Sequence, residues 1–212
     1  MDNRITQTLR RYHDRVSLSR EVMFTALYGS QNYGLDTPES DVDAYSVTVP
    51  SRHELIFGCP SGENPAKSTP SSSYCYGTGK VTVKDVRQMM DAYIKQSINF
   101  CETLFTPYII INPRYAAEVA ELRAHAEKIA SADLYQQLRT TEGMLQSQMM
   151  KTHAPTAPTL AKDAKAFWEE YKLKHDPDEH RKARAKLRNE LADIACSAIA
   201  KNIERQDGEA VE

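Results

Sequence analysis

Apolar and polar positions recur with different periods along the chain, and these periods divide it into a mixed first half and a helical second half. Over 5–18 the apolar residues recur every three or four positions, which predicts an amphipathic helix that covers one face of a sheet. The run over 22–28 is short, bulky and apolar, as in a buried strand. A second strand is predicted over 42–49, ended by Pro50, and we expect the two strands to pair as in a hairpin.

The next part of the chain, 58–79, is rich in proline, serine and glycine and has almost no apolar residues. This composition predicts a long exposed loop. After it, the alternation over 80–84 predicts a third strand, and residues 85–88 predict a capping box that begins a helix reaching to about Asn99. The apolar run 108–111 is either a fourth strand or a packed turn.

Beyond Pro113 the period of the apolar positions is almost continuously helical. The sequence therefore predicts an α+β protein, with a small mixed β-sheet core flanked by helices over 1–112 and an all-helical region over 113–212. The helices expected in the second region cover 114–130, 132–151, 159–175 and 178–206.

Composition and charge exclude several classes of protein. With 27 Lys and Arg against 29 Asp and Glu, the net charge of −2 gives no overall field that would attract nucleic acid or an anionic membrane. No apolar run approaches the roughly 20 residues of a membrane-spanning helix, and the first residues contain no apolar signal-peptide segment. The four cysteines and six histidines form no zinc-binding pattern. We therefore expect a cytoplasmic protein with reduced cysteines and no membrane partner.

A basic cluster within 172–188 has two interpretations. Its seven Lys and Arg side chains could contact the phosphates of RNA or DNA. Acidic residues lie among them in the sequence, however, and this mixture favours a solvated helix face.

The stretch with the most chemical content joins the first two predicted strands. Gly29 and Ser30 follow the first strand, ten residues intervene, and Asp41 and Asp43 begin the second strand as an Asp-x-Asp pair. Each half of this pattern is common by itself, because Gly-Ser is typical of turns and Ser-Asp-x-Asp of capped strand ends. Their combination at this spacing and between two strands is much more specific.

Simple geometry connects this pattern to phosphate and metal chemistry. Residues two apart in a strand project to the same face, so Asp41 and Asp43 are expected side by side, with their Cα atoms about 6.5–7 Å apart. A divalent cation relieves the repulsion between the carboxylates, and Mg²⁺ favours one or two carboxylates together with water and phosphate oxygens. The turn at Gly29 and Ser30 can bring backbone N–H groups and a hydroxyl to a phosphate. The two halves would meet around one triphosphate.

These residues resemble the DNA-polymerase-β-like nucleotidyltransferase superfamily, whose signature is Gly-Ser followed by Asp-x-Asp, and especially its minimal members. The string from Gly29 to Asp43 looks like the predicted-nucleotidyltransferase branch found in bacteria and phages. That branch also tends to contain a segment similar to 99–105. The resemblance covers 22–112, whereas the helical remainder matches only loosely.

The resemblance implies a mixed sheet that binds a nucleoside triphosphate with Mg²⁺, or Mn²⁺, and transfers a nucleoside monophosphate to a hydroxyl acceptor. The acceptor can be a protein, a nucleic acid or a small molecule. Such chemistry consists mainly of positioning and charge neutralisation. The catalytic set implied is Ser30, Asp41 and Asp43, with Asp41 and Asp43 as metal ligands, and the nucleotide-binding set is Gly29, Ser30, Gln31 and Tyr33.

The sequence departs from the family where active members supply a third carboxylate from the third strand, since the matching position here is Thr82. Asp85 is expected to cap the following helix, although a bend at the end of the strand would make it a candidate third ligand. Glu102 is either a structural anchor or a catalytic group. The chain is therefore either an enzyme of reduced activity or a nucleotide-binding or interaction protein, such as a phage regulator or decoy. The preferred nucleotide and the oligomeric state stay open.

Overall fold

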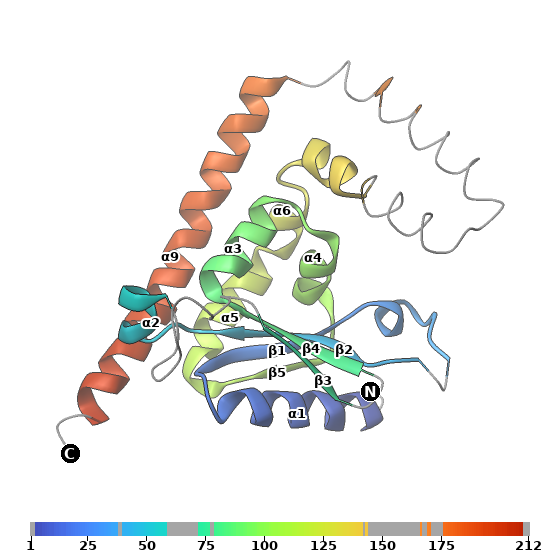
Figure 1. Ribbon diagram of the computed structural model, residues 1–212. Helices are drawn as coiled ribbons and strands as arrows, with labels where there is room; N and C mark the ends of the chain where they lie inside the picture. The colour runs from blue at the N-terminus through green and yellow to red at the C-terminus, as the bar shows by residue number, and fades with distance from the viewer. Residues whose placement is uncertain are drawn as a thin grey trace.

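A computed structural model describes most of the chain (Figure 1). Much of the loop predicted over 58–79 and of the helices predicted over 132–151 and 159–175 lies outside the described residues. The described residues are 3–37, 40–58, 72–76, 79–141, 143, 166, 169–170 and 176–209.

A mixed β-sheet forms the centre of the fold. Its strands are β1 (Val22–Tyr28), β2 (Asp43–Thr48), β3 (Ser72–Tyr76), β4 (Gly79–Asp85) and β5 (Ile109–Ile111). The five strands lie in the order β3-β4-β2-β1-β5. β1 pairs antiparallel with β2 and β5, β3 pairs antiparallel with β4, and β2 and β4 are parallel. The antiparallel pairing predicted for the first two strands is confirmed, and 109–111 is a strand rather than a turn.

The amphipathic helix predicted at the start of the chain is α1 (Asn3–Ser17), and it covers one face of the sheet (Figure 1). Its apolar stripe packs on side chains of β1, β2 and β4, including Leu27, Ala44 and Val81. The hydroxyl of Tyr12 also donates to the carbonyl oxygen of Val42 at 3.0 Å. The buried residues of the stripe are Ile5, Leu9, Tyr12 and Val16.

Helices from both halves of the chain cover the opposite face and share one core (Figure 1). Met23 and Phe24 of the sheet belong to this core together with Leu191 and Ile194 of the last helix. The fold class predicted from the sequence, a small mixed sheet flanked by helices with a helical second half, is confirmed. The helices are α3 (Val86–Ile94), α4 (Ile98–Phe105), α5 (Ala116–Ala124), α6 (Ala126–Ala130) and α9 (Pro177–Glu209), and residues 134–141 are also helical.

Two predictions about single elements are wrong. Part of the predicted loop is the strand β3, which pairs with β4 although its sequence has no apolar alternation. The helix expected to run to Asn99 ends at Ile94, and a new helix, α4, begins at Ile98. The break falls at Gln96, whose φ of 53° is outside the helical range.

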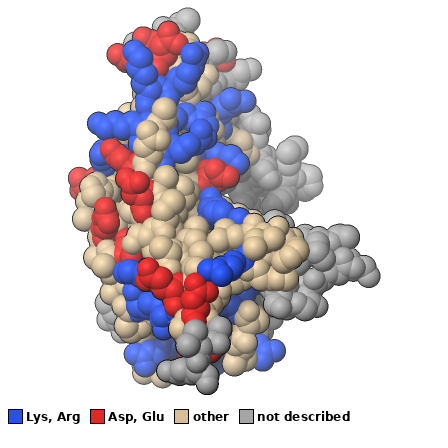
Figure 2. All heavy atoms as spheres, turned by 90° about the vertical axis from the view of Figure 1, so that its left-hand side faces the viewer, with Lys and Arg blue, Asp and Glu red and all other residues tan. Residues whose placement is uncertain are grey.

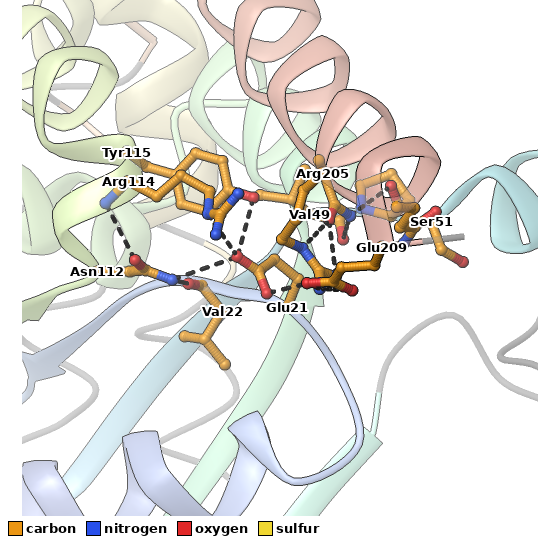
Figure 3. A network of polar contacts seen from close by, with 12 residues as sticks. Glu21, Val22, Val49, Ser51, Asn112, Arg114, Tyr115, Arg205 and Glu209 are labelled. Atoms are coloured by element: carbon orange, nitrogen blue, oxygen red, sulfur yellow. Dashed lines mark hydrogen bonds and ion pairs between the residues drawn. The ribbon is translucent and has the colours of Figure 1, made fainter. Parts of the chain in front are cut away.

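Polar contacts fix the C-terminal half of α9 to the ends of the strands (Figure 3). Glu21, which precedes β1, accepts a hydrogen bond from the Tyr115 hydroxyl at 3.1 Å and pairs with Arg205 of α9 at 3.8 Å. The side-chain amide of Asn202 donates to the carbonyl oxygens of Val49 and Pro50, each at 3.1 Å. A short helix, α2 (Arg52–Phe57), contacts the same part of α9. The contact is an ion pair of 2.8 Å between Arg52 and Asp207.

Candidate functional site

The antiparallel pairing of β1 and β2 brings the two halves of the sequence pattern together. Tyr28, the last residue of β1, lies opposite Asp43, the first residue of β2. Residues that follow β1 and residues that precede β2 therefore meet at the same end of this strand pair. The turn of 3-10 helix after β1, η1 (Ser30–Tyr33), lies at this end.

An open cleft of about 390 Å³ lies at this end of the β1–β2 pair. Five of the six residues predicted to form the site line it, namely Gly29, Ser30, Gln31, Asp41 and Asp43. The sixth, Tyr33, lines a neighbouring pocket instead. The remaining described residues of the cleft are Tyr28, Thr37 and Ser40.

The two aspartates of the cleft belong to different structural elements, a loop and a strand. The sequence predicted that both aspartates belong to the second strand, and for Asp41 this is wrong: β2 begins at Asp43, and Asp41 lies in the preceding loop. The carbonyl oxygen of Asp41 accepts a hydrogen bond from the buried side-chain amide of Gln31, which ties this loop to η1. Asp43 is half-buried, and its Oδ1 accepts a hydrogen bond of 3.2 Å from the backbone N–H of Lys80.

The two carboxylates of the cleft have no basic partner in the part of the chain that the structure describes. Among the described residues, Asp41 and Asp43 form no ion pair with a basic side chain. Burial raises the pKa of Tyr28, and the carboxylate of Asp43 raises it further. Asp41 and Asp43 are the residues of this cleft that could hold a divalent cation, since Mg²⁺ binds oxygen ligands and needs only one or two carboxylates.

Gly29 has a role that differs from the predicted one. Its N–H donates to Oε2 of Glu102 on α4 at 2.7 Å and so contacts the protein instead of remaining for a phosphate. Ser30 is exposed and lines the cleft, which leaves its hydroxyl for an anionic ligand. Of the two residues predicted to hold the triphosphate, Ser30 is therefore the one whose polar group remains available.

Glu102 is anchored between η1 and α4. Besides Gly29, it binds the hydroxyl of Tyr33, and the pKa of Tyr33 rises to about 12 because of burial and the adjacent Glu102 carboxylate. Glu102 lines the neighbouring pocket and not the cleft of Asp41 and Asp43. These contacts correspond to the anchoring role considered for Glu102 in the sequence.

The position of the expected third carboxylate is occupied by Thr82, which lies opposite Tyr45 on the neighbouring strand and binds the Tyr28 side chain. Asp85 caps α3, as predicted, and accepts hydrogen bonds from the N–H groups of Arg87 and Gln88 at 2.8 and 3.0 Å. It pairs with Thr48 at the far end of β2, so it is not a third ligand for the cleft. The described part of the chain contains no group of three or more His, Cys, Asp or Glu residues suited to a metal ion.

Sequence reasoning missed the contribution of the loop between η1 and β2. The N–H of Thr37 donates to the Ser40 hydroxyl at 2.8 Å, and the N–H of Ser40 donates to the Thr37 carbonyl oxygen at 2.9 Å. This reciprocal turn places both residues on the wall of the cleft. Thr and Ser three positions apart in a polar connection are the signal that predicts such a turn.

The described part of the basic cluster lies in the N-terminal half of α9, and none of its residues lines the cleft. Arg181, Lys182, Lys186 and Arg188 are exposed, and Figure 2 shows Lys and Arg side chains gathered over this half of the helix. Acidic side chains at the tip and an ion pair of 3.3 Å between Arg181 and Asp178 fit a solvated face. Lys172 and Lys174 lie outside the described residues.

Comparison of the chain with models of known protein families gives no match, and comparison with curated proteins gives none either. The resemblance to nucleotidyltransferases therefore rests on the sequence pattern alone. No helix in the described ranges is both long enough and apolar enough to cross a membrane.

Proposed function

We propose that the cleft at the end of β1 and the start of β2 binds the triphosphate of a nucleotide with one divalent cation. The protein then transfers the nucleoside monophosphate to a hydroxyl acceptor: the acceptor oxygen loses its proton to water and binds the α-phosphorus, and the bond to the β-phosphate breaks so that pyrophosphate leaves. The observation that carries this proposal is the meeting of Ser30, Asp41 and Asp43 on one cleft whose carboxylates lack basic partners among the described residues. Such a cleft attracts a cation, and the cation attracts phosphate.

Each residue of the cleft has a distinct task in this function. Asp41 and Asp43 hold the cation, which when bound neutralises charge on the phosphates and orients them. The Ser30 hydroxyl donates to a phosphate oxygen. Gln31 keeps the loop of Asp41 against η1 through its hydrogen bond to the Asp41 carbonyl oxygen. The protein thus contributes chiefly position and electrostatics, which is the main requirement of phosphoryl-group chemistry.

A second candidate function is nucleotide binding without transfer. Thr82 stands where the resemblance implies a third carboxylate, and Asp85 lies at the far end of the strand pair. A site with two carboxylates can still bind one cation and a triphosphate. Transfer in the absence of a third acidic ligand is expected to be slow, and faster with Mn²⁺, which accepts a less ideal ligand set than Mg²⁺.

Titration calorimetry with a non-hydrolysable nucleoside triphosphate analogue and Mg²⁺ tests the site. The double variant Asp41→Asn, Asp43→Asn should lose at least about tenfold in metal-dependent affinity. It should unfold at nearly the same temperature, because neither carboxylate forms an ion pair among the described residues and an amide oxygen at position 43 can still accept from the Lys80 N–H. Asp36→Asn is the matched control, since Asp36 is an exposed aspartate of the same connection that does not line the cleft. Equal affinity of the double variant and the control would disprove the site.

A labelling assay separates the two candidates. Wild-type protein is incubated with each α-labelled nucleoside triphosphate, Mg²⁺ or Mn²⁺, and a cell extract. Label that enters protein, RNA or a small molecule, and that is lost in the double variant, supports transfer. Retained nucleotide binding with no label transferred supports binding alone. Thr82→Asp should then raise transfer only if the protein is an enzyme.

A further inference from the structure

A second pocket adjoins the cleft, between η1 and α4. Its volume of about 320 Å³ lies within the usual range of small-molecule sites. The helix η1 contributes to both cavities, because Ser30 and Gln31 line the cleft and the next two residues, Asn32 and Tyr33, line the pocket. The hydrogen bond from Gly29 to Glu102 joins a wall of one cavity to a wall of the other. One molecule could therefore occupy both cavities.

The wall of the pocket suits a flat apolar group. Two aromatic side chains from different elements border it, Tyr33 from η1 and Phe105 from α4, and they are 59% and 51% exposed. Exposed aromatic rings beside a cavity offer surfaces on which a planar ring can stack. The other apolar residues that line the pocket are Ile98, Cys101, Pro107 and Ala130.

The charged and polar groups of the pocket favour a ligand that donates hydrogen bonds. Glu102 is the carboxylate among the described residues that line it, and none of these residues is Lys, Arg or His. Gly29 and Tyr33 hold this carboxylate in place, and a carboxylate has about four acceptor positions, so some remain for a ligand. The same charge repels phosphate. Burial, and then the carboxylate of Glu102, raise the pKa of the Cys101 thiol to about 11, so this cysteine is a neutral wall residue.

We propose that this pocket binds the nucleobase of the nucleotide, and that Glu102 selects a base with an exocyclic amino group. The proposal rests on the proposed function, which places the triphosphate in the adjacent cleft. Adenine, guanine and cytosine carry an amino group that can donate to the carboxylate. Uracil presents two carbonyl oxygens beside its single N–H, and the carboxylate repels them.

Ligand-observed NMR with separate probes tests the two cavities independently. Adenosine and uridine, which lack phosphate, report on the pocket, and tripolyphosphate with Mg²⁺ reports on the cleft. Wild-type protein should bind adenosine at least about fivefold more tightly than uridine, and Glu102→Gln should remove this preference. Gln137→Ala, which alters a polar wall residue without touching the Gly29 contact, gives a second variant should Glu102→Gln fold poorly.

Phe105→Ala should weaken adenosine binding about fivefold or more while tripolyphosphate binding stays unchanged. Phe57→Ala is the matched control, because Phe57 is similarly exposed, at 56%, but lies on α2 beside α9. Adenosine that fails to bind, or binds equally to the Phe105 variant, or no more tightly than uridine, would overturn the inference and leave the proposed function standing. If adenosine binds but tripolyphosphate does not, the proposed function is wrong, whereas the pocket remains a binding site for the base.

Discussion

Gly29 has a backbone conformation that residues with a side chain rarely adopt, with φ of 97° and ψ of −157°. Nothing lies within 4 Å of the position that a Cβ would take, so the restriction comes from the backbone itself. This conformation turns the chain out of β1 and aims the Gly29 N–H at Glu102. The glycine of the Gly-Ser pair is therefore required for the turn more than for contact with a ligand.

Gly29→Ala should destabilise the protein by about 1–3 kcal/mol, because the conformation it imposes on alanine is strained. Thermal and urea unfolding measure the change. Ser30→Ala is the control, since Ser30 is exposed and its replacement should alter the free energy of unfolding by less than about 0.5 kcal/mol. An alanine at position 29 that costs no more than the control would show that the turn relaxes without strain.

The residues of the cleft differ in how far the sequence could predict them. Gly29, Ser30, Asp41 and Asp43 were predictable because one connection between two paired strands holds them all. The contact between Gly29 and Glu102 joins residues 73 positions apart and depends on where α4 packs. Periodicity contains no information about such packing, and for this reason the sequence left the role of Glu102 open and did not show that Tyr33 lines a separate pocket.

At the scale of elements, the break between α3 and α4 illustrates the same limit. Gln96 is fully buried, and its side-chain amide donates to the carbonyl oxygens of Tyr93 at 2.7 Å and Ile129 at 2.9 Å. These contacts hold a non-glycine residue at positive φ, and one of them comes from another helix. With neither glycine nor proline at the break, the sequence shows a continuous helix.

Gln96→Ala should lower the free energy of unfolding by about 1–3 kcal/mol, because two buried hydrogen bonds of the side-chain amide are lost. Gln96→Gly loses the same hydrogen bonds but relieves the positive φ, so it should be the less destabilised variant. Urea denaturation of both proteins measures the difference. A glycine variant that is less stable than the alanine variant would show that the backbone at this position is not strained.

β3 was missed for a different reason. It lies at the edge of the sheet and pairs only with β4 among the described strands. An edge strand can be held by backbone hydrogen bonds without the alternation of apolar residues that marks a strand between two layers. By contrast, β1, β2 and β4 lie between α1 and the other helices, and their sequences predicted them.

Asp85, which caps α3, is expected to affect the stability of the protein but not its binding of nucleotide. Asp85→Ala should destabilise the protein by about 1 kcal/mol, because the side chain accepts from two N–H groups at the start of the helix. The affinity for nucleotide and Mg²⁺ should not change, since Asp85 lies at the opposite end of β2 from Asp43. Calorimetry and thermal unfolding of the same preparation measure both effects. A loss of metal-dependent affinity would restore Asp85 as a metal ligand.

At the scale of the whole molecule, a buried carboxylate joins the two parts of the helical layer. Glu118 of α5 is 3% exposed and lies 2.6 Å from both the Ser197 hydroxyl and the Lys201 ammonium group of α9. Burial by itself raises the pKa of Glu118, but hydrogen bonds from Lys201 and Ser197 outweigh it and lower the pKa below its ordinary value. Folding therefore favours the ionised form of Glu118.

The lowered pKa predicts a specific dependence on acid. The stabilisation is fully present above the pKa of an unfolded glutamate, about 4.3, and is lost as the pH falls through the lower pKa of the folded protein. Glu118→Gln should therefore have a lower free energy of unfolding than wild type at neutral pH, and the difference between the two proteins should become smaller as the pH falls. Urea unfolding between about pH 3 and 7 measures it, with Glu121→Gln on the exposed side of α5 as control. A gap that widens in acid would contradict the assignment.

During synthesis, one side of the core stays exposed to water until α9 has been translated. Translation proceeds at about 5–20 residues per second, so the sheet and its first helices leave the ribosome well before α9. Until then, the surfaces of α3 and α5 that pack on α9 remain in water. The hydrogen bond from Asn202 to Val49 joins residues 153 positions apart, and closing so long a loop slows folding. A nascent chain that stalls before α9 therefore presents an apolar surface to chaperones and proteases.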